Sequence, residues 1–347
     1  MFICYSREQQ IIQIMEEIRT LKMQQNALGS VNNVSRLCLG GGGIGQVWGK
    51  TSRDEAIKTV QASYDAGINF FDMAPMYGNG EAESVMGFAF EDGYPADIKL
   101  TTKCLVGGVE GKTIEQKLRS SLDESCQRMK REYVDVFILH GYVIPDGWDE
   151  SLRPNAQPHI AVEWSNYEQY VVSTFEALKA EGRIGAWGVT AASVQEANRQ
   201  VLKADRKPDV VQCIANLLDS PGSMAICREK PDPREIISLA AKENVGVMGI
   251  RAVAAGALTE NIDRDVKPGS REALDFEKAA DFRRLAAKSG VSSAFLAHRY
   301  ALSMIDVDTV VLGVKDRVEL KECLEAEAAG PLDQSMMNEI ADCCSGN

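Results

Sequence analysis

The sequence predicts an α/β fold, a single (β/α)8 (TIM) barrel with a long loop after its fourth strand and a helical extension at the N-terminus. Short apolar runs rich in β-branched residues alternate with helical patterns, which is typical of a parallel sheet. Eight such runs can be placed along the chain. The 347 residues also suffice for one barrel of about 250 residues with insertions.

The first residues are expected to lie outside the barrel. Residues 1–22 carry apolar side chains at helical spacing, which predicts an amphipathic N-terminal extension. The apolar face of this helix would carry Ile11, Ile14, Met15, Ile18 and Leu21. Residues 23–347 then form the barrel domain.

The eight strands follow in order, and helical patterns fill the intervals between them. We place the strands at residues 36–41, 69–72, 98–103, 134–139, 184–189, 210–214, 245–250 and 309–312. In the first interval Ser52 is a suitable N-cap and Gly67 a suitable stop, which predicts a helix between them. Residues 113–129 and 166–182 have the same helical periodicity.

Two connections are longer than the others. Residues 141–165 follow the fourth strand and contain Trp148, Trp164 and three prolines. A long loop above the face that carries the chemistry is more often functional than not. Residues 251–308 hold two helical patterns, at 270–290 and 291–303.

Composition and charge exclude several classes of partner. A net charge of −12 disfavours nucleic acid and anionic membranes, and no apolar run reaches the ~18 residues of a membrane span. The nine cysteines include no CxxC pair, and the three histidines fit no metal-ligand spacing. We therefore expect a cytoplasmic protein with reduced thiols and no metal, monomeric or homo-oligomeric, whose partner is a small molecule.

Four polar residues stand at or just after the ends of predicted strands. They are Asp72, Tyr77, Lys103 and His140. The C-terminal strand ends of a (β/α)8 barrel meet at the face that carries catalysis. Tyr77 is the predicted general acid and base, because an ammonium at Lys103 should lower the phenol pKa from about 10. Asp72 can hold Lys103 charged, and His140 can donate a hydrogen bond to a substrate oxygen. The alternative interpretation is an ion pair beside an unrelated tyrosine and a core histidine.

These residues lie in stretches that resemble the aldo-keto reductase superfamily. The stretches are "FFDMAPMYGNGEAESVMG", "LTTK", "VDVFILH", "EGRIGAWGVT", "VVQ" and "TVVLGVKDR", in the family order from about residue 23 to about residue 324. The resemblance implies that the four residues protonate a carbonyl oxygen while a nicotinamide delivers hydride to the carbon. It implies an oxidoreductase that interconverts a carbonyl and an alcohol with NADP(H) or NAD(H).

A glycine-rich segment after the first strand has another possible interpretation. Gly40, Gly42 and Gly45 fit the GxGxxG pattern of dinucleotide-binding folds. The predicted helix starts near residue 51 rather than at the last glycine, and no acidic residue ends a strand about 20 residues later. We therefore interpret the motif as a coincidence. By resemblance, backbone at Gly43 passes close to the nicotinamide end of the cofactor.

The resemblance also implies cofactor contacts on the later strands. Thr190 stands where the family commonly has a serine, and Ala191 replaces the usual asparagine. Gln212 matches the glutamine of the family, which implies that it contacts the amide group of the nicotinamide. Ile250 replaces an aromatic residue that stacks on the nicotinamide. Arg251 follows it, facing the expected position of a pyrophosphate; an ordinary ion pair is the alternative.

The segment "LGVKDRVELKECL" resembles the family's site for the adenosine 2′-phosphate. The implied contacts are Gly313, Lys315, Arg317 and Glu322. The two cations favour NADP(H) at a helix start. Glu319 opposes a phosphate, so NAD(H) stays open.

Aromatic residues near the strand ends are candidates for the substrate site. Trp48, Tyr142 and Trp148 are the predicted contacts, and Met76 and Trp164 are further candidates that could be core residues instead. Two alternatives to a carbonyl reductase stay open. One is a sugar dehydrogenase that oxidises the anomeric carbon with the same four residues. The other is a cofactor-binding regulatory subunit, as in potassium channels, for which residues 1–22 would be the docking helix.

Overall fold

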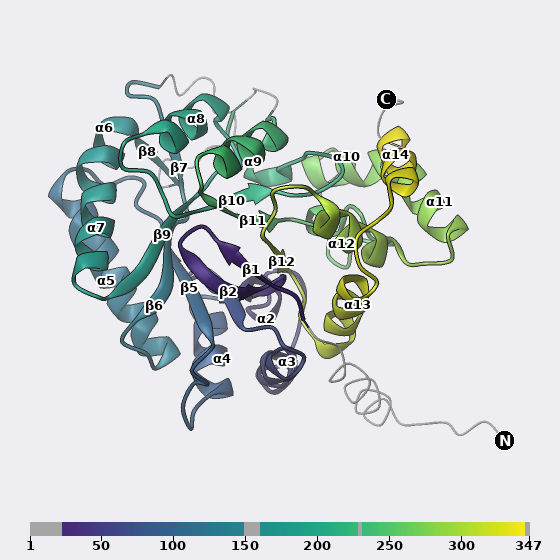
Figure 1. The fold of residues 1–347 in the computed structure, drawn as a ribbon, viewed down its shortest axis with the longest axis horizontal. Coiled ribbons are helices and arrows are strands. Elements are labelled where there is room, and N and C mark those ends of the chain that lie inside the picture. The colour runs from purple at the N-terminus through teal and green to yellow at the C-terminus, as the bar shows by residue number, and fades with distance from the viewer. Residues whose placement is uncertain (1–22, 149–159, 228–230, 344–347) are drawn as a thin grey trace.

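Eight parallel strands close into one barrel, as the sequence predicts. The computed structural model describes residues 23–148, 160–227 and 231–343, so the expected helix at 1–22 lies outside the described residues. The strands run around the barrel in the order β3, β4, β5, β6, β9, β10, β11 and β12, and β12 pairs with β3 to close it. Figure 1 shows the helices arranged around this sheet.

The strand positions agree with the sequence prediction to within one residue at each end. The bounds are β3 Leu37–Gly40, β4 Phe70–Asp72, β5 Lys99–Cys104, β6 Val134–Leu139, β9 Ile184–Thr190, β10 Val210–Ile214, β11 Gly246–Ile250 and β12 Thr309–Leu312. Because parallel strands need a crossover on each return, a helix or long connection follows each of them.

The helices occupy most of the predicted intervals. Their bounds are α2 Gly41–Ile44, α3 Arg53–Asp65, α4 Glu81–Ala89, α5 Lys112–Met129, α6 Trp164–Asn166, α7 Ser173–Ala180, α8 Gln195–Lys203, α9 Pro233–Lys242, α10 Arg271–Lys278, α11 Ala280–Lys288, α12 Ser293–Ser303, α13 Arg317–Ala328 and α14 Gln334–Asp342. A π-helical segment, Tyr167–Val172, joins α6 to α7. Ser52 caps α3 by accepting a hydrogen bond from Glu55 N, as expected of an N-cap.

Three elements depart from the prediction. The continuous helical pattern at 270–290 is two helices, because the backbone of Ala279 leaves the helical conformation between α10 and α11. The expected loop at 141–165 contains two short paired strands, β7 Tyr142–Ile144 and β8 Ala161–Glu163. An antiparallel hairpin of β1 Gln25–Leu28 and β2 Val31–Ser35 precedes the barrel and was not predicted.

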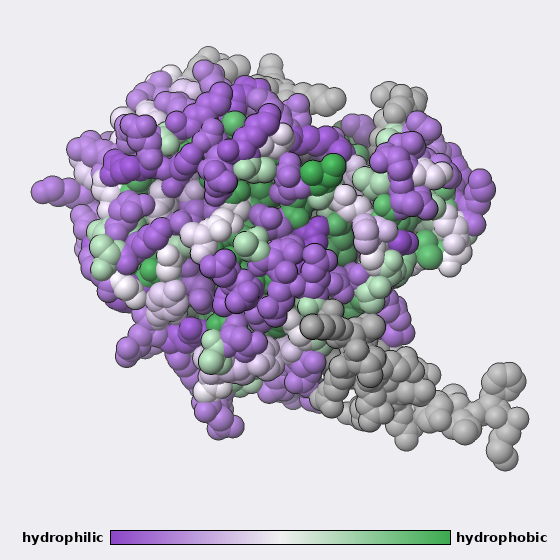
Figure 2. Space-filling view, in the orientation of Figure 1, coloured by the Kyte–Doolittle hydropathy of each residue, from purple (hydrophilic) through white to green (hydrophobic). Residues whose placement is uncertain are grey.

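This hairpin packs onto the N-terminal end of the barrel. Its apolar residues Leu28, Val31 and Val34 are buried in one cluster with barrel residues. Gly29 makes the turn with φ of 56°, and a Cβ there would lie 2.1 Å from the carbonyl oxygen of Asp209. Only glycine fits such an approach. In Figure 1 the hairpin crosses in front of the barrel, and Figure 2 shows that this face is mostly hydrophilic.

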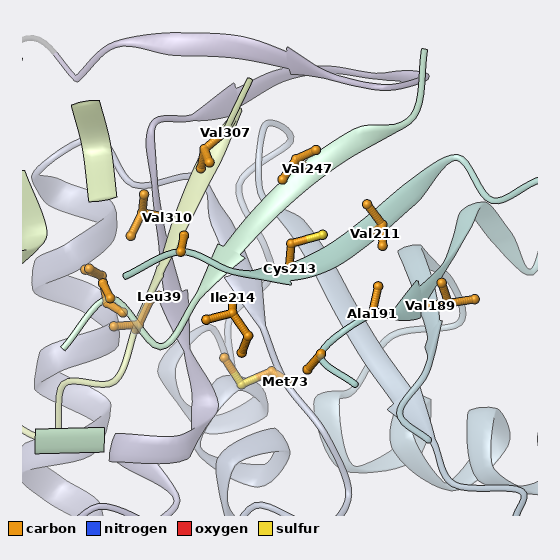
Figure 3. Packing of buried hydrophobic residues seen from close by; sticks show 14 of the residues in the cluster. Leu39, Met73, Val189, Ala191, Val211, Cys213, Ile214, Val247, Val307 and Val310 are labelled. Carbon is orange, nitrogen blue, oxygen red and sulfur yellow. The ribbon is translucent and has the colours of Figure 1, made fainter. Parts of the chain in front are cut away.

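Successive side chains point to opposite faces of each strand, so the buried apolar residues form one core inside the barrel and another between the sheet and the helices. The barrel members of the inner cluster are Cys38, Phe70, Val136, Ile138, Ala186, Val210 and Met248. Residues of opposite parity, such as Val211 and Cys213 of β10, pack in the larger cluster between the sheet and the helices. Figure 3 shows this outer packing around β10 and β11. Since side chains alternate along a strand, the next inward positions after Phe70, Ile138 and Val210 are Asp72, His140 and Gln212.

Candidate active site

The ends of three neighbouring strands bring the four predicted polar residues together above the apolar interior. Asp72 is the last residue of β4, Lys103 lies near the end of β5, and His140 directly follows β6. Tyr77 lies in the turn between β4 and α4. Lys103 is fully buried and Asp72 is 2% exposed, so these charges depend on each other rather than on water.

The ammonium of Lys103 has a partner for each of its three hydrogens. Nζ lies 2.9 Å from Asp72 Oδ2, and it donates to the carbonyl oxygen of Met73 at 2.7 Å and to Tyr77 Oη at 3.3 Å. An ammonium offers three donors and no acceptor. The orientation of Lys103 is therefore fully determined by Asp72, Met73 and Tyr77.

The carboxylate of Asp72 accepts two further hydrogen bonds. Thr101 Oγ1 donates to Oδ1 at 2.6 Å, and Gln212 Nε2 donates to Oδ2 at 3.1 Å. Both donors are buried. Thr101 was not predicted to belong to this site; its signals in the sequence are its position two residues before Lys103 and the register of β4 with β5, in which it pairs with Asp72.

His140 completes the group from the other side of the phenol. Its Nε2 lies 3.5 Å from Tyr77 Oη, and the two rings are nearly perpendicular, at 88°. Burial lowers the pKa of His140 well below its usual range, and the nearby Lys103 charge lowers it further. The imidazole is therefore neutral at pH 7, and a neutral ring keeps one N–H to donate.

The pKa of Tyr77 differs from the prediction. Burial of the hydroxyl raises the pKa above its usual value of 10, and this outweighs the lowering by Lys103. The expected effect of Lys103 is present, but the expected net lowering is wrong for the protein alone. For Lys103, burial by itself would lower the pKa, yet the attraction of Asp72 and Tyr77 outweighs it and the pKa is raised.

Two strands beside this group present buried polar side chains. Thr190 and Gln212 are register partners on β9 and β10, and Thr190 Oγ1 is buried without a hydrogen-bond partner. Because a carboxylate only accepts hydrogen bonds, the amide nitrogen of Gln212 must face Asp72, which turns the amide oxygen away from it. The Thr190 hydroxyl and the Gln212 amide oxygen can together hydrogen-bond a ligand that carries an amide group.

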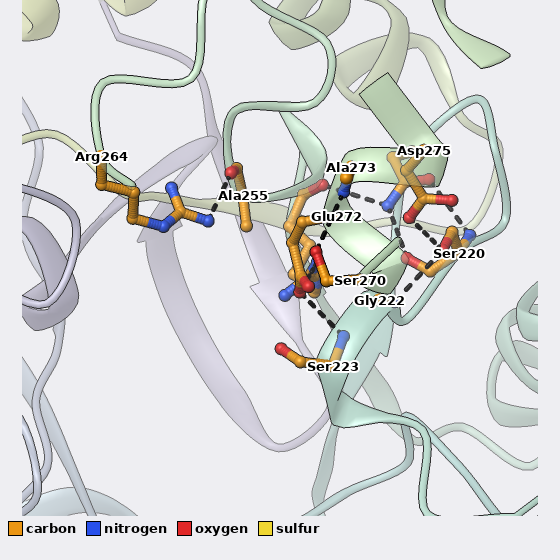
Figure 4. A network of polar contacts seen from close by, with 11 residues as sticks. Ser220, Gly222, Ser223, Ala255, Arg264, Ser270, Glu272, Ala273 and Asp275 are labelled. Carbon is orange, nitrogen blue, oxygen red and sulfur yellow. Dashed lines mark hydrogen bonds and ion pairs between the residues drawn. The ribbon is translucent and has the colours of Figure 1, made fainter. Parts of the chain in front are cut away.

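Arg251 follows β11 in a left-handed backbone conformation, with φ of 60°. Its Nε and Nη2 are buried without hydrogen-bond partners, and Nη2 lies 3.5 Å from Glu272 Oε1. Figure 4 shows Glu272 at the start of α10, where it accepts a hydrogen bond from Ser223 N at 2.8 Å. A buried guanidinium with unused donors suits an anionic ligand. Ile250 precedes it and is partly buried.

The glycine-rich loop packs against the loop after β12. A Cβ at Gly43 would lie 1.9 Å from the carbonyl oxygen of Val314, so glycine allows the two backbones to touch. Trp48 lies between the loops, because a Cβ at Gly42 would meet its Nε1 at 2.5 Å and one at Gly313 its Cδ1 at 3.3 Å. The closed barrel confirms that GxGxxG here does not mark a doubly wound fold.

The predicted phosphate contacts are ion-paired within the protein. Lys315 Nζ lies 2.8 Å from Asp263 Oδ2 and also contacts Glu319. Arg317 forms two bonds to Glu55 of α3, at 3.0 and 2.9 Å. Glu322 accepts a hydrogen bond from Ser292, the N-cap of α12. Each of these groups thus has a protein partner that a ligand would have to share or displace.

The candidate substrate contacts differ in burial. Tyr142 is buried on β7, Trp148 and Trp164 are partly buried against the core, and Met76 is 54% exposed. Trp48 lies beside Gly42 and Gly313. In the described residues no three of His, Cys, Asp and Glu are placed to hold a metal ion. None of the helices described could cross a membrane.

Comparison with known proteins agrees with this geometry. The model of the "Aldo/keto reductase family" matches residues 36–344. The chain is 26% identical over 336 residues to L-galactose dehydrogenase of Arabidopsis thaliana, covering 92% of this chain and 93% of that protein. It is 26% identical over 298 residues to a probable voltage-gated potassium channel subunit beta of the same plant, covering 80% and 83%.

A solved structure gives the same fold. The aldo-keto reductase from Klebsiella pneumoniae, in complex with NADPH, superposes with a TM-score of 0.64 at 17% identity, covering 93% of this chain and 95% of that chain. The match of the family model spans nearly the whole sequence and includes Asp72, Lys103 and His140. This chain therefore belongs to the aldo/keto reductase family of oxidoreductases.

Proposed function

We propose that the protein interconverts a carbonyl and an alcohol, with Tyr77 as general acid and base. The observation that carries this proposal is the placement of Tyr77 Oη, 3.3 Å from Lys103 Nζ and 3.5 Å from His140 Nε2. A phenol between an ammonium and a neutral imidazole can give up a proton and be stabilised as the anion. A substrate oxygen beside Oη would then receive that proton.

Each member of the group has a separate task. The nicotinamide cofactor, when bound, supplies the hydride. Tyr77 passes its proton to the carbonyl oxygen, and Lys103 stabilises the phenolate that forms. Asp72 keeps Lys103 charged and in place, and the neutral His140 donates a hydrogen bond that orients the substrate oxygen. In the oxidative direction the same groups act in reverse, with the phenolate accepting the alcohol proton.

Residues on the later strands fit a nicotinamide cofactor. Thr190 Oγ1 is buried without a hydrogen-bond partner, and the amide oxygen of Gln212 points away from Asp72. Both atoms suit the carboxamide group of the nicotinamide. Ile250 would pack on the ring, and Arg251, with unused donors, suits the pyrophosphate. The backbone at Gly43 and Gly313 would lie beside the same ligand. This fit is the reason to expect a dinucleotide rather than another hydride source.

NADP(H) is the cofactor we propose, with NAD(H) as the alternative. Lys315 and Arg317 would bind the 2′-phosphate, and Glu322 would contact the adenine end. The NADPH-bound structure from Klebsiella pneumoniae supports this choice by fold alone. Glu319 and Asp263 beside Lys315 support the alternative, because their charges oppose a phosphate.

The substrate we propose is a small carbonyl compound or alcohol in contact with Trp48, Tyr142 and Trp148. A sugar dehydrogenase is the second candidate, and the likeness to L-galactose dehydrogenase favours it. The cysteines that the structure describes are free thiols, in agreement with action in the cytoplasm, where thiols stay reduced.

Two measurements on the full chain test the proposal. Quenching of protein fluorescence on titration with NADPH and with NADH reports cofactor binding. Absorbance of the reduced nicotinamide then reports turnover on a panel of aldehydes, ketones and, with the oxidised cofactors, aldoses. We expect binding and turnover with at least one class, and loss of turnover in Tyr77→Phe. Binding without any turnover would favour a regulatory subunit, and turnover that survives Tyr77→Phe would refute the assigned mechanism.

A further inference from the structure

We propose that Thr101 is a positioning residue of the proton-transfer site, whose hydroxyl fixes the carboxylate of Asp72 so that Lys103 stays against Tyr77. This inference rests on the proposed function. Thr101 is fully buried, and among the described residues its hydroxyl bonds to Asp72 rather than to the phenol of Tyr77 or the imidazole of His140. Its effect on the reaction would pass through Asp72 and Lys103.

The two oxygens of Asp72 have different partners. Oδ1 accepts from Thr101 Oγ1 at 2.6 Å, whereas Oδ2 receives both Lys103 Nζ at 2.9 Å and Gln212 Nε2 at 3.1 Å. The terminal torsion of an aspartate is broad, so a carboxylate held at one oxygen can turn. A short bond at Oδ1 removes this freedom and keeps Oδ2 directed at Lys103.

The position of Oδ2 decides how close Lys103 can lie to the phenol. Of the three contacts of Nζ, the bond to the Met73 carbonyl is fixed by backbone, and the 3.3 Å contact with Tyr77 Oη is the longest. If the carboxylate turned, the ammonium would follow its counter-charge. The longest contact would weaken first, and the phenolate would lose stabilisation.

Thr101 also affects the charge distribution in the group. A hydroxyl that donates to a carboxylate spreads its negative charge, so Asp72 attracts Lys103 less strongly than an unbonded carboxylate would. Without that donor, Lys103 would be drawn toward Asp72 and away from Tyr77. The pKa of Tyr77, which burial already raises, would rise further.

The neighbouring residue provides a matched control. Thr102 is equally buried on the same strand, and its hydroxyl also donates to a carboxylate, Glu83 Oε1, at 2.5 Å. Because side chains alternate along β5, Thr102 points away from the four residues, toward Glu83 of α4 and Ser125 of α5. Removing either hydroxyl should disturb the fold similarly, but only the loss at Thr101 should reach Tyr77.

The test compares Thr101→Val, Thr101→Ser and Thr102→Val in the full chain, with the cofactor and substrate that the wild type turns over. We expect Thr101→Val to lower kcat about tenfold with KM changed less than about twofold. The limb of the pH–rate profile that reports Tyr77 should move to higher pH. Thr101→Ser keeps the donor and should restore both properties, and Thr102→Val should move neither.

An unchanged pH profile in Thr101→Val, or the same change in Thr102→Val, would overturn the proposal. If Thr101→Val does not fold, the pair Thr101→Ala and Thr101→Ser gives the same comparison. If the wild type turns over no substrate, the proposed function fails by itself. The role of Thr101 is then tested by following tyrosinate absorbance during a pH titration. The difference in absorbance between each protein and the same protein carrying Tyr77→Phe isolates the titration of Tyr77. An upward shift of the Tyr77 titration in Thr101→Val supports the positioning role, and no shift refutes it.

Discussion

Two opposing influences act on the hydroxyl of Tyr77. Burial favours the neutral phenol, and Lys103 favours the phenolate, but burial is the larger in the protein alone. The phenol is therefore the resting form at neutral pH. An acid that delivers a proton to a carbonyl oxygen must begin protonated, so this balance suits the reductive direction of the proposed reaction.

Replacement of Tyr77 by Phe is expected to separate binding from chemistry. The change removes the proton donor but leaves Thr190, Gln212 and Arg251 in place on other strands. A general acid of this kind contributes roughly 10²–10⁴-fold, so kcat should fall by that factor. The dissociation constant of the cofactor, measured by fluorescence quenching, should stay within about twofold. Full activity in this variant would show that another group supplies the proton.

The residue positions at this site could be predicted, but their electrostatics could not. Asp72, Lys103 and His140 stand at or next to the ends of strands, and the end of a strand is visible in a sequence. The pKa of Tyr77 depends on how much water reaches its hydroxyl, which only the packed structure determines. Thr101 looks like any threonine in a strand until the register of β4 with β5 places it beside Asp72.

The packing of α12 against α13 contains a buried histidine. His298 Nδ1 donates to the carbonyl oxygen of Ala294, 2.8 Å away, and its Nε2 lies 3.5 Å from Cys323 Sγ. Burial lowers the pKa of His298 to about 4. The unfolded chain binds a proton at this residue below pH ~6.5, whereas the folded protein does not until about pH 4.

Stability should therefore fall as the pH is lowered through this window. His298 alone should cost up to about 3 kcal/mol of unfolding free energy between neutral pH and pH ~4. His298→Gln disturbs the hydrogen bond to Ala294 O and removes the titration, so the variant should be less stable than wild type at pH ~7 and the gap should narrow toward pH ~4. Urea unfolding at several pH values measures this. A gap that stays constant with pH would show that His298 titrates normally.

The loop between β12 and α13 gathers charges of both signs. Lys315 is neutralised by Asp263 and Glu319, and Arg317 by Glu55. A 2′-phosphate bound here would have to compete with these carboxylates. A charge-assisted contact contributes ~1.5–3 kcal/mol, which corresponds to about tenfold or more in affinity.

The choice of cofactor should respond to these charges. Lys315→Ala with Arg317→Ala is expected to raise the NADPH dissociation constant about tenfold or more, with a weaker salt dependence, and to leave NADH nearly unchanged. Glu319→Gln removes an opposing charge and should shift the preference toward NADPH. Equal effects on both cofactors, measured by fluorescence titration, would mean that the 2′ end is recognised elsewhere.

Elements with strong local patterns were predicted well, and elements made by tertiary context were not. Most barrel strands are largely apolar runs, because both of their faces are buried. The hairpin β1–β2 has few apolar residues and two adjacent asparagines, Asn32 and Asn33, which are rare in strands. It forms because its few apolar residues are buried against the N-terminal end of the barrel. The pair of Arg317 with Glu55 spans 262 residues and has no local signal.

The whole molecule should tolerate loss of its first residues up to the hairpin and no further. Residues 1–22 are expected to be dispensable, because the barrel closes without them. A chain that starts at Met23 should stay folded and active. A chain that starts at Arg36 should lose the cover of Leu28, Val31 and Val34, and become insoluble or far less stable. Thermal melting followed by circular dichroism, together with turnover, tests both truncated chains. An inactive or unfolded Met23 product would contradict the first expectation.

The complete hydrogen bonding of Lys103 has a consequence for a protein proposed to handle aldehydes. An aldehyde condenses with a free, unprotonated amine to form an imine, and such an adduct would block the site. Lys103 is held as an ammonium, which has no lone pair, and its three hydrogens are occupied by Asp72, Met73 and Tyr77. In the proposed reaction, the contacts that prepare the phenol for proton transfer would also protect the lysine from an aldehyde substrate.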